Sequence, residues 1–445
     1  MLNAEQPFTD EVTTGRFIVV FDIDGDDFDA PALLSECGLG DVADSRDFST
    51  AAEGSVAAAG TDTYFAELGI AVVSADPERL GMLRSVAAGR QRPVAVSPEL
   101  MHHVLAPAHA ESRGQTRTRG RRAAAAAPDS PTAVPTNFED NDAFTWGLQA
   151  TLAAESAYSG QGIRVAVLDT GFDTSHPDFA GRTVVAKSFV DGEDATDGHG
   201  HGTHCIGSAC GPRAPEGSRG YGVAHEADIY SGKVLGASGS GTDATILAGI
   251  DWAVGNGCAI VSMSLGADVA QIHPPYVAAG QRALAKGTLI IAAAGNNANR
   301  SVGDFGFVGA PANSPYIMAV GALDGTLEMA DFSARTLPGR GGQVDVAGPG
   351  VEIHSSWPMP ERYRSISGTS MATPHAAGVA ALLAEATGLR GRELWAEVVQ
   401  EARRLESASV DVGAGLVQAP PPADPSLPNT SGMRARVAEP LPGQG

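Results

Sequence analysis

The chain has 445 residues, which exceeds one small domain and suits an enzyme core with a second folded unit. Hydrophobic residues make up 43% and charged residues 18%, so the composition supplies a large apolar core. The 52 acidic residues outnumber the 30 basic ones, and the formal net charge of -22 argues against nucleic-acid partners and anionic lipid surfaces.

The first hundred residues predict a small α+β unit. Strand patterns cover 17–21, 70–73 and 92–99, and helical patterns cover 31–36 and 77–86. The residues before the first strand lack the basic and apolar regions of a signal peptide, and no apolar run approaches the roughly 20 residues of a membrane span. We therefore expect no membrane span and no export by the common route.

A change of composition separates this unit from the rest of the chain. Alanine, proline, serine, threonine and arginine dominate 106–135, and five arginines between 113 and 122 have no aromatic residues among them. This pattern favours an exposed linker open to proteolysis over a nucleic-acid-binding patch. The predicted division is a front unit (1–105), a linker with a processing site (106–140), a main domain (141–418) and a disordered tail (419–445).

The main domain alternates short apolar strands with longer helices, which predicts an α/β fold. Such alternation implies a mostly parallel sheet covered on both faces, with the site at the carboxyl ends of its strands. The predicted strands are 163–168, 229–234, 260–263, 289–293 and 317–320, and the predicted helices are 201–210, 243–254, 275–286 and 369–384.

Two of these segments carry chemistry at their ends. Asp169 follows a buried strand, where its carboxylate could serve a site or merely cap the next turn. The run 197–204 is dense in glycine and histidine, and His201 opens the following helix. Three histidines in this run also resemble the spacing of metal ligands, but no HExxH pattern is present, so a zinc site is the weaker alternative.

Ser370 starts a helix of small residues, with Pro374 in the first turn. A hydroxyl at this place can act as a nucleophile, because the free amides of the helix start can receive an oxyanion. The alternative role is an N-cap serine.

Together, the segments 169–171, 201–204 and 368–375 resemble the three signatures of the subtilisin-like serine protease family, the subtilases. The chain order Asp, His, Ser fits as well, and the resemblance extends over about 145–418. It implies the family's three-layer α/β fold and a serine endopeptidase that forms an acyl-enzyme. By the same resemblance, Ser370 is the nucleophile, His201 the general base, Asp169 its orienting partner and Asn296 the oxyanion donor.

Further residues match the family's substrate-binding strands, which pair with the backbone of an extended peptide. Small residues around the first side-chain pocket, which includes the 310–312 turn, favour medium or large apolar substrate side chains. The substrate-binding set is Ser238, Gly239, Ser240, Gly241, Ser264, Leu265, Gly266, Ala294 and Gly295.

The four cysteines, Cys37, Cys205, Cys210 and Cys258, show neither a disulfide framework nor zinc spacing. Cys205 and Cys210 would face different sides of one helix, so no bridge between them is expected. Cys205 follows His201 by four residues, and the segment is similar to the thiol-bearing, proteinase K-like branch, which predicts partial inhibition by mercurials. The alternative is a buried cysteine that acts as a small apolar residue.

No cofactor is expected for catalysis. The acidic loop 191–197 could bind structural calcium, which is common in the family, but its spacing does not match an EF-hand and a solvated acidic face is favoured. We therefore name no metal ligands from the sequence.

The front unit resembles the family's propeptide in position and in its α+β, ferredoxin-like pattern. This resemblance implies a monomeric precursor that inhibits itself in cis until the linker is cut and then acts on polypeptide substrates. Secretion is the family habit, whereas the start of the chain favours the cytoplasm or another export route. Two rivals remain: a silent peptide-binding relative, which would lack a triad or oxyanion residue, and a sedolisin-like acid peptidase, which would lack the signature at 201–204.

Overall fold

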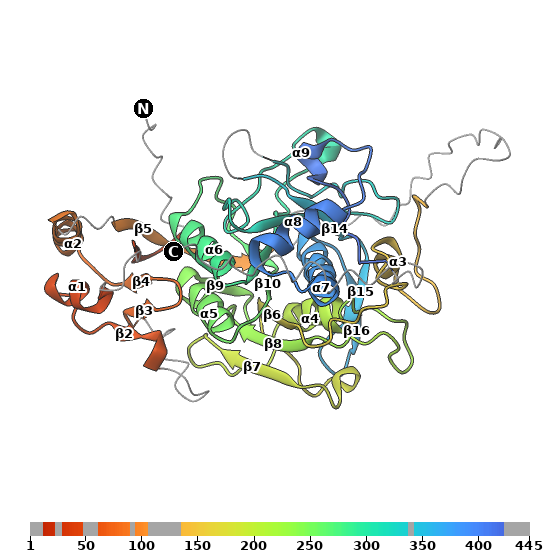
Figure 1. The fold of residues 1–445 in the computed structure, drawn as a ribbon, viewed down its shortest axis with the longest axis horizontal. Helices are drawn as coiled ribbons and strands as arrows, with labels where there is room; N and C mark the ends of the chain where they lie inside the picture. The colour runs from red at the N-terminus through yellow and green to blue at the C-terminus, as the bar shows by residue number, and fades with distance from the viewer. Residues whose placement is uncertain are drawn as a thin grey trace, which may run out of the picture.

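The computed structural model describes residues 12–22, 29–47, 61–89, 94–105, 135–336 and 342–421. Figure 1 shows a smaller front unit beside a larger main domain. Most of the predicted linker (106–134) and nearly all of the predicted tail (422–445) lie outside the described residues. The described end of the linker contacts the main domain, where the amide of Phe138 donates to the Gly325 carbonyl at 2.7 Å.

A seven-stranded parallel sheet forms the centre of the main domain, which confirms the predicted fold class. Its strands, in spatial order, are β14 (Val346–Pro349), β13 (Met318–Leu323), β12 (Leu289–Ala293), β10 (Ile260–Met263), β6 (Arg164–Asp169), β8 (Asp228–Lys233) and β7 (Val184–Ser188). The middle strands β10, β12 and β13 are buried along their whole length, in keeping with their largely apolar sequences.

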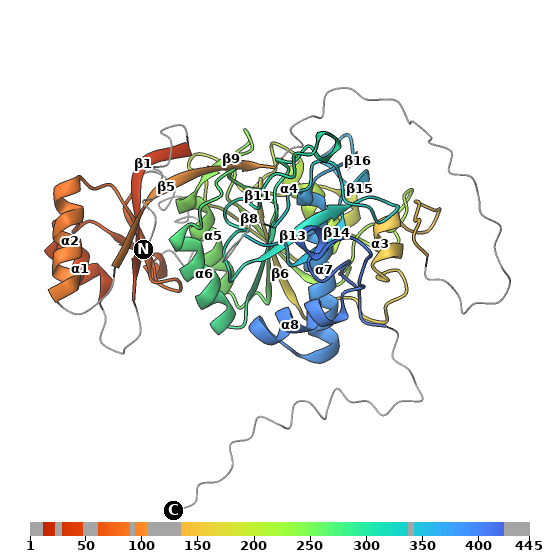
Figure 2. The ribbon, with the colours of Figure 1, turned by 90° about the horizontal axis from the view of Figure 1, so that it is seen from above.

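Helices cover both faces of this sheet. Figure 2 shows α5 (Asp243–Gly255) and α6 (Pro274–Ala285) on one side, and α4 (His201–Cys210) and α7 (Thr369–Thr387) on the other. Alternate side chains of β6 serve the two cores: Val165 and Val167 pack with α4 and α7, while Ala166 and Leu168 pack with α5 and α6. The sheet is therefore the middle of three layers.

The front unit consists of a mostly antiparallel sheet, in which β2 and β3 pair parallel, with two helices on its outer face, as Figures 1 and 2 show. Val19 and Phe21 pack under these helices, whereas Ile18, the neighbour of Val19 and therefore on the opposite face of the strand, joins the core beneath α5 and α6. The front unit and the main domain thus share one apolar core. The elements are β1 (Thr13–Phe21), α1 (Ala30–Glu36), β2 (Ala43–Asp44), β3 (Thr63–Phe65), β4 (Ile70–Val73), α2 (Pro77–Gly89) and β5 (Val94–Val104).

Strand β5 continues past its predicted end into the main domain. The sequence predicts a strand over 92–99, but β5 runs to Val104 because its second half pairs with β9 (Ser240–Thr242) and β11 (Leu265–Gly266). These pairings are tertiary, so no local pattern signals them.

The remaining elements frame the sheet. They are α3 (Trp146–Ala150), α8 (Gly391–Glu401), α9 (Ser409–Val412), the hairpin of β15 (Ile353–Ser356) and β16 (Tyr363–Ile366), and the 3-10 turns η2 (Ser45–Asp47), η3 (Pro177–Phe179) and η4 (Arg300–Val302).

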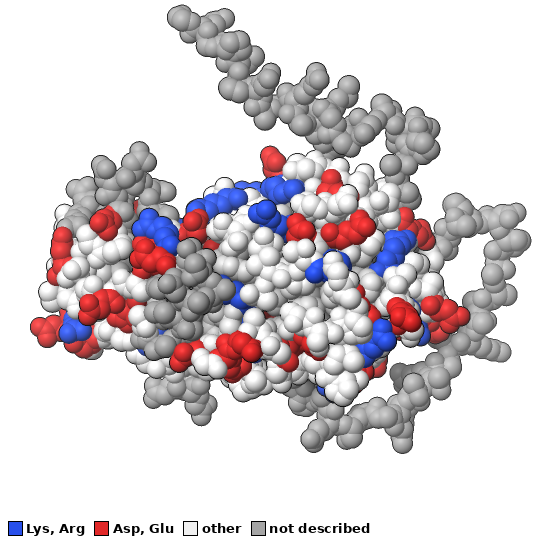
Figure 3. Space-filling view, turned by 90° about the horizontal axis from the view of Figure 1, so that it is seen from below, with Lys and Arg blue, Asp and Glu red and all other residues white. Residues whose placement is uncertain are grey.

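Charged side chains of both signs occur on the surface. On the face drawn in Figure 3, acidic and basic side chains are interspersed. Among the residues that the structure describes, none of the helices is long and apolar enough to span a bilayer.

Candidate active site

The site lies where strand and helix ends meet at one edge of the parallel sheet. Asp169 is the last residue of β6, His201 the first of α4, and Ser370 the second of α7. Asn296 follows β12 by three residues. The carboxyl ends of parallel strands and the amino ends of the following helices share this edge, which is why residues far apart in sequence meet here.

Asp169 and His201 form a buried pair. Nδ1 of His201 donates to Oδ1 of Asp169 at 2.8 Å, and both side chains are nearly inaccessible, with 4% and 1% exposure. Burial alone would lower the pKa of His201, but the neighbouring Asp169 carboxylate outweighs it and holds that pKa well above its ordinary value. The other ring nitrogen, Nε2, has no hydrogen-bond partner, so it is available to take a proton.

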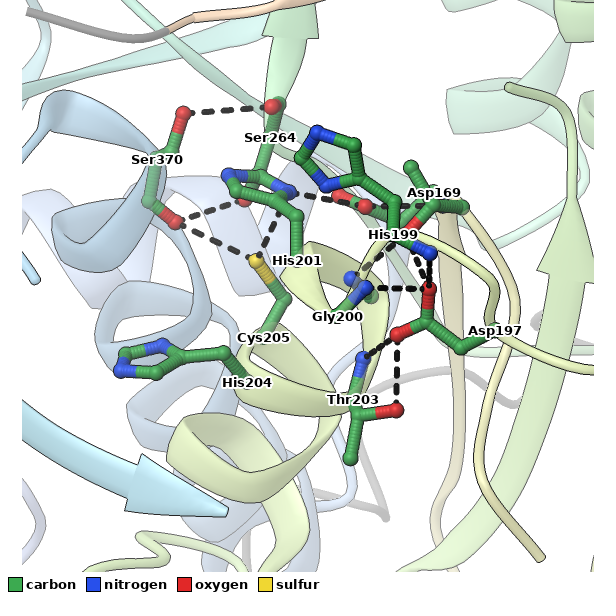
Figure 4. A network of polar contacts seen from close by, with 12 residues as sticks. Asp169, Asp197, His199, Gly200, His201, Thr203, His204, Cys205, Ser264 and Ser370 are labelled. Carbon is green, nitrogen blue, oxygen red and sulfur yellow. Dashed lines mark hydrogen bonds and ion pairs between the residues drawn. The ribbon is translucent and has the colours of Figure 1, made fainter. Parts of the chain in front are cut away.

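Ser370 lies on the other side of the imidazole, as Figure 4 shows. Its hydroxyl donates to the Ser264 carbonyl at 3.2 Å and to the Leu105 carbonyl at 3.4 Å. The Ser264 hydroxyl in turn donates to the Ser370 carbonyl at 2.8 Å. No hydrogen bond joins the Ser370 hydroxyl to Nε2 of His201, which has no partner among the described residues.

Asn296 is oriented by its neighbours in α7. Its Oδ1 accepts from the amide and the hydroxyl of Thr369 at 2.9 and 2.8 Å. Its Nδ2 therefore points away from α7 and donates to the carbonyl of Leu105 at 2.5 Å. The amide is thus held as a donor toward a backbone carbonyl beside Ser370.

A carboxylate that the sequence analysis assigned only to the acidic loop holds the start of α4. Asp197 is buried, and its two oxygens accept from Thr170 Oγ1 at 2.8 Å, Gly200 N at 2.7 Å and Thr203 N at 2.8 Å. The N-cap residue itself is Gly200, which has no side chain, so Asp197 accepts the first-turn amide of Thr203 from three residues ahead of the cap. A carboxylate shortly before a helix that starts with glycine is the signal that could have identified it. Asp197 therefore ties the His201 helix to the end of β6.

Close approach of backbone explains a glycine in the same motif. A Cβ added at Gly202 would lie 2.2 Å from the carbonyl oxygen of Gly171. Only glycine lets the first turn of α4 lie this close to the residues that follow Asp169.

The predicted substrate-binding residues meet the end of the front unit. In the pairing of β5 with β9 and β11, His102 faces Gly241, His103 faces Ser240 and Val104 faces Leu265. Val104 N also donates to the Gly239 carbonyl at 2.8 Å. Gly266 pairs with His103. Ala294 and Gly295 are buried, and the amide of Gly295 donates to the Thr369 hydroxyl in α7. Ser238 is exposed and precedes β9.

In the described part of the chain, neither the cysteines nor the acidic loop forms a second group of metal ligands. Cys37, Cys205, Cys210 and Cys258 are all buried, and none of them forms a disulfide. Cys205 Sγ lies 3.7 Å from His201 Nδ1 and 3.6 Å from the Ser370 carbonyl. In the described parts of the chain, the one group of three potential metal ligands is Asp169, His201 and Cys205.

Two other acids of the loop have protein partners. Glu193 bonds Lys233 Nζ at 3.1 Å and the amide of Ala237, and Asp194 accepts from Thr196 N at 2.8 Å. Structural calcium stays a prediction from the family resemblance.

Comparison with known proteins gives consistent matches. Residues 160–416 match the model of the Subtilase family. Subtilisin DY of Bacillus licheniformis is 39% identical over 238 residues, 53% of this chain and 81% of that protein. Subtilisin Savinase of Lederbergia lenta is 41% identical over 242 residues, which are 54% of this chain and 83% of that protein. M-protease of Shouchella clausii is 42% identical over 242 residues, which are 54% of this chain and 59% of that protein.

Proposed function

Since the chain belongs to the subtilase family, it is a serine endopeptidase, and we propose that Ser370, His201 and Asp169 carry its reaction. The Ser370 hydroxyl attacks the peptide carbonyl and passes its proton to Nε2 of His201, which has no other partner. Asp169 keeps Nδ1 of the ring protonated and stabilises the imidazolium.

The oxyanion is received by Nδ2 of Asn296 and by the amide of Ser370 in the first turn of α7, where helix amides lack partners within the helix. His201 then returns the proton to the leaving amine as the carbon–nitrogen bond breaks. Water activated by His201 finally hydrolyses the ester on Ser370. The observation that carries this assignment is the Leu105 carbonyl, which accepts from both Asn296 and Ser370.

The same contact supports a self-inhibited precursor. Residues up to Leu105 act as a propeptide, because their last strand occupies the backbone partners that a substrate needs. We assign the first cut to the Leu105–Ala106 bond, since the carbonyl of Leu105 already accepts from the oxyanion donor. Because the front unit shares the apolar core beneath α5 and α6, we expect it to stay bound after the cut.

Intact-mass spectrometry tests both assignments. The wild-type chain and Ser370→Ala are incubated at neutral pH and treated with a fluorophosphonate probe. We expect the wild type to divide between Leu105 and Ala106 and to react with the probe, whereas Ser370→Ala stays whole and unlabelled. An intact, unlabelled wild type would instead favour a silent peptide-binding relative.

We propose a monomeric enzyme from the family resemblance. Its partners are polypeptide substrates and its own propeptide. Secretion, the family habit, and structural calcium stay predictions.

A further inference from the structure

The end of the front unit is held as a peptide substrate would be held. Residues 101–104 pair antiparallel with β9 and β11, and the Leu105 carbonyl contacts Asn296 and Ser370. A substrate that presents its own carbonyl to Asn296 would therefore place its preceding residues along the same strands. His102 lies three residues before Leu105. Its surroundings are therefore those of the substrate side chain three residues before the attacked carbonyl.

The side chain of His102 is completely buried against charged and polar groups of the main domain. Its Nε2 lies 2.7 Å from Oδ1 of Asp243, and neither side chain is exposed to solvent. The hydroxyl of Tyr276 donates to the same oxygen at 2.7 Å, and the Tyr276 ring packs edge-on against the imidazole. We call Asp243, His273 and Tyr276 the imidazole site.

Asp243 accepts from four donors, two from each unit. His273 Nε2 lies 2.8 Å from Oδ2, and this contact and that of Tyr276 come from the main domain. The front unit supplies the imidazole of His102 and the amide of Leu100, which donates to Oδ2 at 2.7 Å. Burial would raise the pKa of Asp243, but the imidazoles of His273 and His102 hold it below its usual value.

When the front unit leaves, a buried carboxylate loses two of its donors. Asp243 opens α5, so it cannot leave its place without unwinding the first turn of the helix. A substrate with an apolar side chain in place of His102 would cover the carboxylate and leave it short of a donor, which is costly for a buried charge. A side chain with an N–H group would restore the contact.

We propose that Asp243 selects peptide substrates that carry an imidazole, or another compact N–H donor, three residues before the residue whose carbonyl is attacked. The inference rests on the proposed function and names its substrate class. A pocket of small and apolar residues alone would accept many side chains at this substrate position. The buried carboxylate of Asp243 instead favours side chains that can donate a hydrogen bond to it.

The neighbouring histidine provides a matched control. His103 is exposed, and its Nδ1 lies 3.0 Å from the hydroxyl of Ser240. Because side chains alternate along a strand, His103 points away from the imidazole site while His102 points into it. The two histidines therefore separate selection at one position from a general preference for histidine.

The experiment compares fluorogenic peptides on the purified full-length chain after it has processed itself and the cleaved front unit has been separated from it. The parent peptide has the sequence of residues 99–107, and three variants carry leucine or glutamine in place of the first histidine, or glutamine in place of the second. We expect kcat/KM to fall about 10-fold or more with leucine at the first histidine and less with glutamine there. Substitution of the second histidine should leave kcat/KM close to that of the parent.

The enzyme variant Asp243→Asn tests the selecting group itself. It should bring the ratio of kcat/KM for the histidine and leucine peptides toward one. If that variant does not fold, the peptide comparison on the unmodified enzyme decides alone.

Casein hydrolysis is measured in parallel to keep the two proposals apart. Equal kcat/KM for the histidine and leucine peptides, with casein hydrolysed, would overturn the selection and leave the protease assignment standing. Hydrolysis of neither casein nor any peptide would overturn the proposed function and this inference with it.

Discussion

Nδ2 of Asn296 donates to the carbonyl oxygen of Leu105 at 2.5 Å, so the amide that should stabilise the oxyanion already holds a carbonyl of the same chain. The contact joins residues 191 positions apart and links the predicted active site to the end of the front unit. If Asn296 is the oxyanion donor, as we propose, the chain holds its own peptide where a substrate would lie.

Asn296→Ala should lower kcat far more than it changes KM, because the lost hydrogen bond strengthens only as the oxyanion forms. The expected loss is about 10²- to 10³-fold in kcat, the range found when the corresponding side-chain donor of subtilisin itself is removed. Steady-state kinetics on a peptide substrate measure it. Asn256→Ala, at the end of α5, is the control and should keep its kcat; a KM effect alone at Asn296 would argue against the oxyanion role.

The pH dependence of kcat/KM should reflect His201. The ring must be neutral to accept the Ser370 proton, and the Asp169 carboxylate outweighs burial and raises the pKa of His201 well above 6.5. Activity is therefore lost as the pH falls through this raised pKa, and the acid limb should lie above the ordinary histidine range.

Asp169→Asn should move that limb to lower pH and reduce kcat, because the carboxylate that favours the imidazolium is gone. Rate measurements between pH 5 and 10 with both proteins check this. An acid limb below pH 6.5 in the wild type would contradict the prediction.

The strongly periodic and continuously apolar segments could be predicted from the sequence almost to the residue. The expected ends of α4, β4, β10 and β12 coincide with the observed ones. Their apolar patterns are local, so each segment carries its own signal. By contrast, β7 is an edge strand with a partly exposed pattern and β14 consists of Val-Ala-Gly-Pro, whose glycine and proline are weak strand formers, and neither was predicted.

What the sequence could not reveal depends on partners far along the chain. The extension of β5 exists because β9 and β11 pair with it, and His102 meets Asp243 across 141 positions. The site motifs were recognisable because their residues recur in a known pattern, whereas the imidazole site has no such pattern. Asp197 was expected to be a solvated loop acid, yet it is buried, because its role depends on the amides that α4 presents to it.

Asp197→Ala should destabilise the protein by about 3 kcal/mol or more, because a buried carboxylate that satisfies several donors is removed. Urea unfolding in a Ser370→Ala background, which avoids self-digestion, measures the free energy of unfolding. Asp191→Ala is the matched control in the same loop; its side chain is exposed, so a change within about 0.5 kcal/mol is expected. Calcium-dependent stability that Asp191→Ala abolishes would show that the loop binds an ion after all.

Cys205 should make the enzyme sensitive to mercurials. Its sulfur lies 3.7 Å from His201 Nδ1 and 3.6 Å from the Ser370 carbonyl, so a mercury atom there would displace both proposed catalytic residues. Burial raises the pKa of the Cys205 thiol, so the reaction should be slow and its rate should be followed over hours.

The comparison that isolates this thiol uses Cys205→Ala and Cys258→Ala, since both cysteines are buried and Cys258 precedes β10, away from the site. Inhibition should persist in Cys258→Ala and disappear in Cys205→Ala. Mass spectrometry of the treated wild type locates the mercury. Full activity with Cys205 fully modified would mean that the thiol only fills space beneath the imidazole, because an adduct that displaces His201 cannot leave proton transfer intact.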